Sequence, residues 1–186
     1  MKAAIFTLDT ESYKARKASA AGMVLKKLLE QSGFETAAVR VIPKDRKVAA
    51  SVLKRVAEEQ TAELVLTTGA AGHLESDCAP YALMDVAERL LPGIPETLRA
   101  FRNRDSLQAV LDCSAAGVCK KTLMVNLPGD AKEAKEALEF ILPELKRAIE
   151  MDTVDFFWRW RMPCFCLIII RAVSPKWIRK KHCLYL

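Results

Sequence analysis

The sequence predicts a three-layer α/β/α sandwich with a mostly parallel sheet. Apolar, strand-like segments alternate with amphipathic, helix-like segments through residues 1–150. Strands that are separated by helices usually run parallel, and their sheet needs a helical layer on each face. Two of the strand-like segments, 63–72 and 122–129, also end in glycine-containing turns. The 186 residues are enough to bury one substantial core.

The N-terminal half shows the alternation most clearly. Apolar residues recur at helical spacing between positions 23 and 29, and Gly33 marks the end of that helix. Pro43 closes the apolar segment that follows, because proline cannot continue a central strand. The expected elements are strand 3–8, helix 19–31, strand 35–42, helix 45–60 and strand 64–67.

The C-terminal half is expected to complete the sandwich. Pro80 suits the first turn of a helix, and Pro92-Gly93 marks the end of that helix. The expected elements are helix 80–91, shorter helices at 95–103 and 106–113, strand 123–127 and helix 130–150. Residues 116–118 are the place where a short antiparallel strand is most easily missed.

Cysteine usage favours a cytoplasmic protein, and the charge distribution says little about the partners of the main domain. The net charge is +6, but residues 151–186 hold seven Lys/Arg and two Asp, so this tail carries +5 and the rest about +1. The basic balance therefore gives no reason to expect a nucleic-acid partner for the main domain. The cysteines follow no disulfide framework, which is typical of a reducing compartment. The N-terminus has no apolar stretch of signal-peptide length.

Residues 151–186 form a basic extension that differs from the rest of the chain. All three tryptophans lie in it, as does the apolar run 162–170. Nine residues fall far short of the roughly 20 that span a bilayer. The leading interpretation is a disordered or non-native extension, such as one from a shifted reading frame. Packing against the core or a partner chain is the second interpretation, and membrane contact the least favoured.

The two glycine turns predict an anion-binding edge. A buried strand that stops in small residues leaves backbone N–H groups free to face a ligand. The carboxyl ends of parallel strands and the N-termini of the following helices meet at one edge of such a sheet. We therefore expect the turns at Gly69–Gly72 and Pro128–Gly129 to lie together.

These segments resemble the molybdopterin adenylyltransferase family, the MoaB/Mog-type domain of molybdenum cofactor biosynthesis. The resemblance covers about residues 1–150 and depends on the order and spacing of several pieces. They are Leu64-Val-Leu-Thr-Thr-Gly-Ala-Ala-Gly72, Asp77 with Pro80, Leu91-Pro-Gly-Ile-Pro-Glu96, Ala115-Ala-Gly117 and Lys121-Thr-Leu-Met-Val-Asn-Leu-Pro-Gly129. The resemblance implies a three-layer α/β fold and a homotrimer. It also implies adenylylation of the terminal phosphate of molybdopterin by ATP with Mg²⁺, and release of pyrophosphate.

The resemblance implies that two aspartates are catalytic and bind the metal. Asp77 matches the family's aspartate in Arg-Asp-Val-Thr-Pro-Glu, although the neighbouring arginine, threonine and acid are changed here. The second family aspartate follows an Ile-Pro pair, where this chain has Lys44 and places Asp45 one position later. Either Asp45 serves after a one-residue shift, or the metal site is impaired. Both aspartates have a competing interpretation as caps of the helices that follow them.

The resemblance also implies a set of substrate-binding residues. These are Thr7, Asp9, Thr68, Gly69, Gly72, Asn126, Pro128 and Gly129. Several neighbours depart from the family pattern: Ala70-Ala71 replaces Gly-Thr, Ser19 replaces an acid, Asp112-Cys113 replaces Ser-Arg and Asp130 replaces a serine. An acid at 130 caps a helix well but repels an incoming phosphate. The hypothesis requires Thr68, Asp77 and Asn126 to converge around one cavity.

Two classes of function remain. The leading hypothesis is a divergent adenylyltransferase that acts on molybdopterin or a related phosphorylated pterin. The alternative is a non-catalytic module of the same fold that carries or senses a pterin or nucleotide. Lys44, the Gly-Ala-Ala-Gly loop and Asp130 are the features that favour the alternative.

Overall fold

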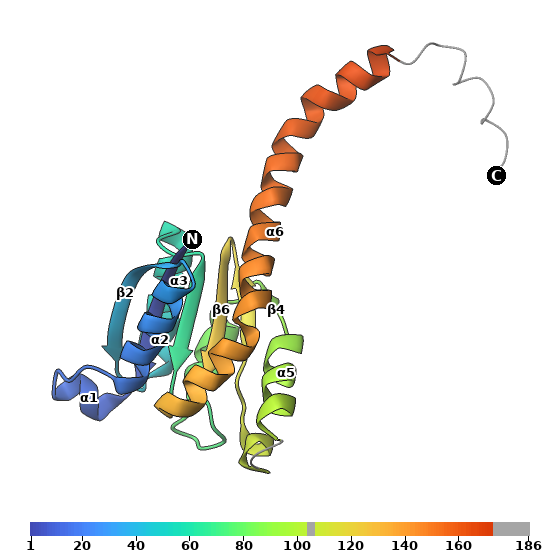
Figure 1. Ribbon diagram of the computed structural model, residues 1–186. Helices are drawn as coiled ribbons and strands as arrows, with labels where there is room; N and C mark the ends of the chain where they lie inside the picture. The colour runs from blue at the N-terminus through green and yellow to red at the C-terminus, as the bar shows by residue number, and fades with distance from the viewer. Residues whose placement is uncertain (104–106, 173–186) are drawn as a thin grey trace, which may run out of the picture. The chain divides into compact units, whose positions relative to one another are not determined.

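A computed structural model describes residues 1–103 and 107–172, with side chains through Met151 except at 107–108. The elements alternate as the sequence predicts (Figure 1). They are β1 Lys2–Leu8, α1 Thr10–Lys14, α2 Ala20–Gln31, β2 Glu35–Ile42, α3 Arg46–Glu59, β3 Leu64–Thr68, α4 Ala79–Val86, β4 Arg89–Leu90, α5 Gly93–Arg102, the 3₁₀ turn η1 Leu107–Leu111, β5 Ala116–Cys119, β6 Thr122–Leu127 and α6 Ala131–Ala172.

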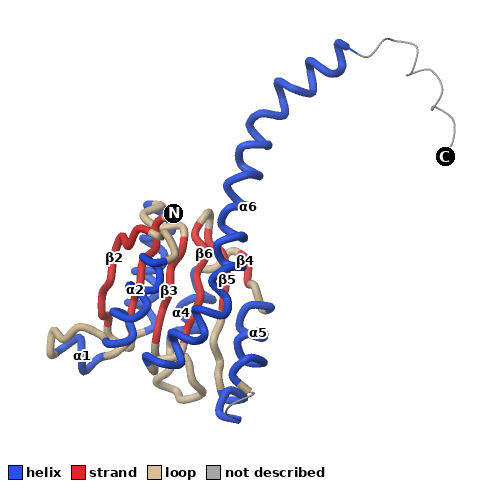
Figure 2. The backbone as a smooth tube through the Cα atoms, in the orientation of Figure 1, coloured by secondary structure: helices blue, strands red, loops and turns tan. Residues whose placement is uncertain are grey.

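One six-stranded sheet in the order β2-β1-β3-β6-β5-β4 organises the main domain (Figure 2). The four strands β2, β1, β3 and β6 are parallel, and β5 pairs antiparallel with both β6 and β4. The four parallel strands therefore end at a common edge, where the loops that precede α1 and follow β3 begin (Figures 1 and 2). This edge carries the candidate functional site.

Helices cover both faces of the sheet, which confirms the predicted three-layer fold. On one face, apolar residues of β1, β3 and β6 pack with α2, α5 and α6 around residues such as Leu25, Leu66 and Leu138. On the other face, the alternate residues of the same strands pack with α3 and α4 around Phe6, Leu53 and Leu83. The central strand β3 is buried along its whole length because it is covered from both sides.

The predicted helix 80–91 is wrong at its C-terminal end. Helix α4 stops at Val86, and residues 89–90 form β4 instead. The Glu88 N–H donates to the Val118 carbonyl, and the Leu91 N–H donates to the Ala116 carbonyl. Gly117 permits this approach, because a Cβ there would lie 2.9 Å from the Arg89 carbonyl oxygen. Pairing with the antiparallel strand β5 therefore replaces the last helical turn.

Two other boundaries also differ. The segment expected as helix 106–113 forms the shorter 3₁₀ turn η1, and the final helix continues past position 150 to Ala172. The chain divides into two compact units, residues 1–149 and 150–186. Within the described residues, no helix is both long and apolar enough to cross a membrane.

Candidate functional site

Two neighbouring cavities open at the edge where the parallel strands end. The first cavity has a volume of about 440 Å³, and its wall includes Gly69, Gly72, Asp77, Arg102, Pro128 and Gly129. The second cavity has a volume of about 560 Å³, and its wall includes Thr7, Asp9, Lys17, Ser19, Lys44 and Asp130. Gly69, Ala70 and Gly129 line both cavities, so the two glycine turns form the ridge between them.

Close backbone packing requires glycine on this ridge. A Cβ on Gly129 would lie 3.2 Å from the Gly69 Cα, and a Cβ on Gly69 would lie 3.1 Å from the Leu8 carbonyl oxygen. Gly69 also has a φ of +85°, which strongly favours glycine. Ala70 follows it with a φ of +51°, so a methyl-bearing residue occupies the left-handed region there. The turns thus present backbone rather than side chains to a ligand.

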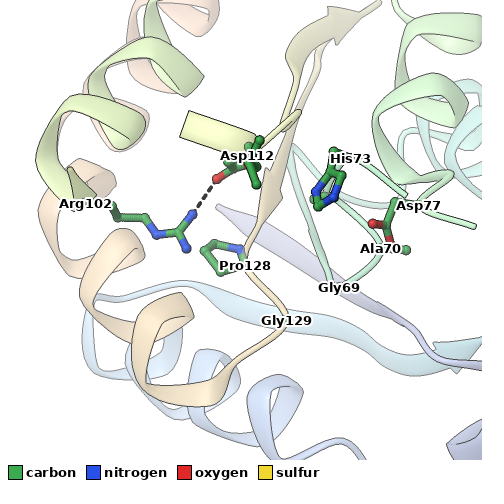
Figure 3. A pocket seen from close by; sticks show the side chains of 11 residues that line it. Gly69, Ala70, His73, Asp77, Arg102, Asp112, Pro128 and Gly129 are labelled. Atoms are coloured by element: carbon green, nitrogen blue, oxygen red, sulfur yellow. Dashed lines mark hydrogen bonds and ion pairs between the residues drawn. The ribbon is translucent and has the colours of Figure 1, made fainter. Parts of the chain in front are cut away.

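Asp77 lies in the wall of the first cavity, across from Arg102 (Figure 3). Its side chain is 9% exposed, and Oδ2 accepts a hydrogen bond from the Leu74 N–H at 3.2 Å. A Cβ at Gly72 would lie 2.6 Å from that same oxygen, so glycine at 72 makes room for the carboxylate. Asp77 does not cap α4: the N-cap is Cys78, which makes no side-chain capping bond.

Arg102 supplies a cation to the first cavity, and sequence reasoning missed it. Nη1 lies 2.5 Å from Asp112 Oδ2, and Nη2 lies 2.5 Å from Glu133 Oε2. Arg99 supports the same loop by donating to the Asp112 carbonyl oxygen at 3.1 Å. The contact joins α5, the η1–β5 loop and α6, so no sequence spacing could have indicated it. The Arg102–Asp112 pair faces His73 and Asp77 across the cavity (Figure 3).

Thr68 and Asn126 lie beneath the cavities and do not line the wall of either one. Thr68 is fully buried, and its hydroxyl donates to the Pro128 carbonyl oxygen. The Asn126 carboxamide accepts from the Ala115 N–H at 3.0 Å and donates to the Thr67 hydroxyl. Both side chains therefore tie β3 to the segments around β6. Of the predicted trio, only Asp77 has its side chain in a cavity wall.

Asp45 is the N-cap of α3. Its Oδ1 accepts from the Lys47 N–H at 2.8 Å and from the Val48 N–H at 3.0 Å. It lines neither cavity, whereas its neighbour Lys44 lines the second. Burial raises the pKa of the Cys78 thiol, and the charges of Asp45 and Asp77 add to that increase. The carboxylates of Asp45 and Asp77 therefore both disfavour the Cys78 thiolate. The protonated thiol is a poor nucleophile.

Two aspartates of the second cavity cap helices. Asp9 caps α1, and hydrogen bonds from the Ser12 hydroxyl and the first-turn N–H groups lower its pKa. Asp130 accepts from the Lys132 and Glu133 N–H groups at the start of α6, and these bonds lower its pKa. Both groups stay ionised near neutral pH. Each charge lies against a helix N-terminus that stabilises it.

A family described as "Probable molybdopterin binding domain" matches residues 4–147. The molybdopterin adenylyltransferase of Haemophilus influenzae is 38% identical over 100 residues, which cover 54% of this chain and 51% of that protein. The Escherichia coli K12 protein of that name is 35% identical over 100 residues, with the same coverage. The chain thus spans about half the length of these relatives.

Solved structures agree with the fold. The molybdopterin biosynthesis enzyme MoaB of Thermus thermophilus is 30% identical, with a TM-score of 0.74 over 81% of this chain and 94% of that chain. The Mog protein of Mycobacterium ulcerans has a TM-score of 0.76 over 81% of this chain and 97% of that chain. At 24% identity, the second likeness concerns the fold alone.

Proposed function

The chain belongs to the family of probable molybdopterin binding domains, and from this we propose that it adenylylates molybdopterin in molybdenum cofactor biosynthesis. The relatives named molybdopterin adenylyltransferase support this activity. The observation that carries the proposal is the first cavity, where two glycine turns, Asp77 and Arg102 meet at the carboxyl ends of the parallel strands. Ligands of open α/β sheets bind at such an edge.

The proposed reaction joins two anionic groups. A terminal phosphate oxygen of molybdopterin attacks the α-phosphorus of ATP, and the bond from that phosphorus to the pyrophosphate oxygen breaks. The protein must hold both phosphates in line and offset their charge. The Gly69 N–H donates to the Leu127 carbonyl oxygen, so other backbone N–H groups of the turns that follow β3 and β6 position the phosphates. Arg102 orients a phosphate from the cavity wall, held in place by Asp112 and Glu133, which compensate its charge.

A Mg²⁺ requirement is part of the proposal. Protein-bound Mg²⁺ is commonly held by one or two carboxylates together with substrate phosphates. Asp77 fits this role because its carboxylate lines the cavity and Oδ1 has no hydrogen bond among the described residues. In the described part of the chain, no group of three or more His, Cys, Asp or Glu side chains forms a metal site. When bound, the ion would offset phosphate charge. Asp45 contributes to the stability of α3, which it caps.

The test is the formation of adenylylated molybdopterin by the full chain with ATP, followed by chromatography. We expect product with the wild type and a loss of about 100-fold for Asp77→Asn. The matched control is Glu75→Gln, which removes the same charge from an exposed position of the same loop and should retain activity. Equal activity of Asp77→Asn and wild type would contradict the proposed role of Asp77.

A non-catalytic module is the second candidate. Lys44 and Asp130 both line the second cavity, and Ala70 occupies a backbone conformation that favours glycine. This candidate predicts ligand binding without Mg²⁺ and without turnover, which calorimetry measures. If the wild type is inactive but Lys44→Asp forms product, the fold retains the chemistry and lysine 44 impairs the metal site.

The oligomeric state and the cellular location of the protein are also proposals. We propose a homotrimer from the family resemblance, with a pterin as the partner ligand. A cytoplasmic location rests on the scattered cysteines, of which Cys78, Cys113 and Cys119 are unpaired among the described residues. Lipid co-sedimentation that disappears on deletion of residues 151–186 would support membrane contact by the extension.

A further inference from the structure

Strand β2 forms one edge of the sheet, and its outer side has no partner strand in the described part of the chain (Figure 2). A register shift leaves Ala37 as an extra residue opposite β1, and the pairing is regular after it. The Ile42 carbonyl accepts from the Asp9 N–H, so the backbone of Ile42 faces inward. Because backbone groups alternate in direction along a strand, those of Val39 and Val41 point out of the sheet.

A cavity of about 400 Å³, the edge groove, lies between the outer side of β2 and the segment that joins α1 to α2. Its wall includes Tyr13, Arg16, Lys17, Val39, Arg40 and Val41. Among the described residues, no hydrogen bond from outside the sheet reaches the backbone of Val39 or Val41. The N–H and C=O groups of both valines are therefore free to face the groove. An unpaired strand edge of this kind is a template for another extended chain.

The charged side chains of the edge groove are all basic. Arg16, Lys17 and Arg40 line it, and no Asp or Glu among the described residues does. In the described part of the chain, none of the three lies within 4.0 Å of a carboxylate oxygen. Lys17 also lines the second cavity, where Asp9 and Asp130 lie, so Arg16 and Arg40 decide the charge of the groove. The edge groove thus favours an acidic occupant.

The charge also limits which chain can occupy the edge groove. Residues 151–186 of this chain hold seven Lys/Arg and two Asp, so they carry +5 and have the wrong sign. A second copy that paired its own β2 with this strand would bring two sets of Arg16 and Arg40 together. Like charges that face each other across paired strands destabilise the pairing. An acidic segment of a different protein fits both the free backbone groups and the charge.

We propose that the edge groove binds an extended acidic peptide of a partner protein, which adds to the sheet as a strand beside β2. The backbone groups of Val39 and Val41 hydrogen-bond to the peptide's main chain. Arg16 and Arg40 attract its acidic side chains, so main-chain bonds supply affinity and the arginines supply specificity. The inference does not depend on the proposed reaction, because both arginines lie outside the first and second cavities.

Fluorescence anisotropy of a labelled peptide mixed with the full chain tests the proposal. The probe has about eight residues, the length of a short strand, in which pairs of glutamates alternate with pairs of valines. Both faces of the added strand then carry acid. We expect saturable binding to the wild type, and affinity at least about tenfold weaker when glutamine replaces every glutamate of the peptide. No binding of the acidic peptide would overturn the proposal and leave the arginines as protection of the edge against aggregation.

Methylation of the peptide's backbone nitrogens separates strand addition from simple charge attraction. Methyl groups on every second nitrogen remove the N–H donors from one side of an extended chain and leave its charge unchanged. Of the two alternate sets of positions, one should abolish binding and the other should have little effect, because only one side of the added strand meets β2. Equal affinities of the two methylated peptides would contradict strand addition.

Variants of the protein locate the peptide on β2. Arg40→Gln should weaken binding about threefold. Arg16→Gly should have a similar effect and should leave thermal stability unchanged or higher, because Arg16 has a φ of +51° that favours glycine. The matched control is Arg89→Gln, which removes the same charge from an exposed position of β4, the opposite edge strand. Equal losses in Arg40→Gln and Arg89→Gln, or full affinity in a protein that carries both Arg16→Gly and Arg40→Gln, would overturn the proposal.

Discussion

Ala70 shows at the scale of one residue how this chain departs from its family and retains the backbone path. The loop 69–72 turns as a glycine loop would, although a methyl group occupies the left-handed conformation at φ +51°. That conformation costs an L-residue other than glycine about 1–2 kcal/mol. The backbone path is held from both sides, because the Ala79 N–H donates to the Ala70 carbonyl and the Cys113 N–H donates to the Ala71 carbonyl.

We predict that the strain at Ala70 can be measured against its neighbour. Ala70 and Ala71 are each 7% exposed, but only Ala70 has a positive φ. Ala70→Gly and Ala71→Gly each remove one buried methyl group. Only Ala70→Gly also relieves the backbone strain of a positive φ. We therefore expect the Ala70→Gly protein to be more stable than the Ala71→Gly protein by about 1 kcal/mol. Urea unfolding measures this; equal free energies of unfolding would show that the loop is not strained.

The predictability of the site differs from residue to residue. The glycines could be found because they follow strand ends, and such ends meet at one edge of a parallel sheet. Asp77 was found only through the family resemblance. The inward direction of Thr68 and Asn126 could not, because a polar residue at a strand end can face a ligand or a neighbouring strand. Arg102 was invisible for another reason: its partners Asp112 and Glu133 are brought to it only by the tertiary fold.

At the scale of elements, the four parallel strands and the helices α2, α3 and α5 were predicted correctly, whereas the short elements α1 and β4 and the end of α4 were not. The end of α4 illustrates the limit. Residues 87–91 have an ordinary helical composition, but hydrogen bonds to Ala116 and Val118 draw them into the sheet. Local propensity is worth only tenths of a kcal/mol per residue, so such pairing overrides it. The antiparallel strand β5, which the sequence left open, is the element that causes this change.

We predict that Asp45 acts on α3 and not on the reaction. Asp45→Ala should lower the free energy of unfolding by about 1 kcal/mol, because two N–H groups lose their acceptor. Asp45→Ser should keep both the stability and the adenylylation activity, because serine caps a helix but cannot replace a carboxylate at a metal ion. Unfolding curves and product formation are measured on the same preparations. A serine variant that is stable and inactive would instead identify Asp45 as a metal ligand.

At the scale of the whole molecule, the first compact unit contains a complete sandwich. Among the described side chains, both core clusters consist of residues up to Ile149. The contribution of α6 to the core comes from residues 134–149, which cover one face of the sheet beside α2 and α5. A domain boundary near residue 150 stays a prediction from composition, since the tryptophans and most of the net charge lie beyond it.

We predict that a chain ending at Glu150 unfolds cooperatively, with a free energy of unfolding within about 1 kcal/mol of the full chain. The reason is that such a truncation removes no residue of either core cluster. A chain ending at Phe140 is the control, because it loses Ile141, Leu142, Leu145 and Ile149. Each buried aliphatic side chain of this size is worth about 1.5–3 kcal/mol, so four are worth about 6–12 kcal/mol, which is comparable to the roughly 5–15 kcal/mol stability of a whole domain. Urea unfolding followed by circular dichroism should therefore show a normal transition for the first chain and none for the second. A loss of several kcal/mol on truncation at Glu150 would mean that the extension packs against the sandwich and is part of the fold.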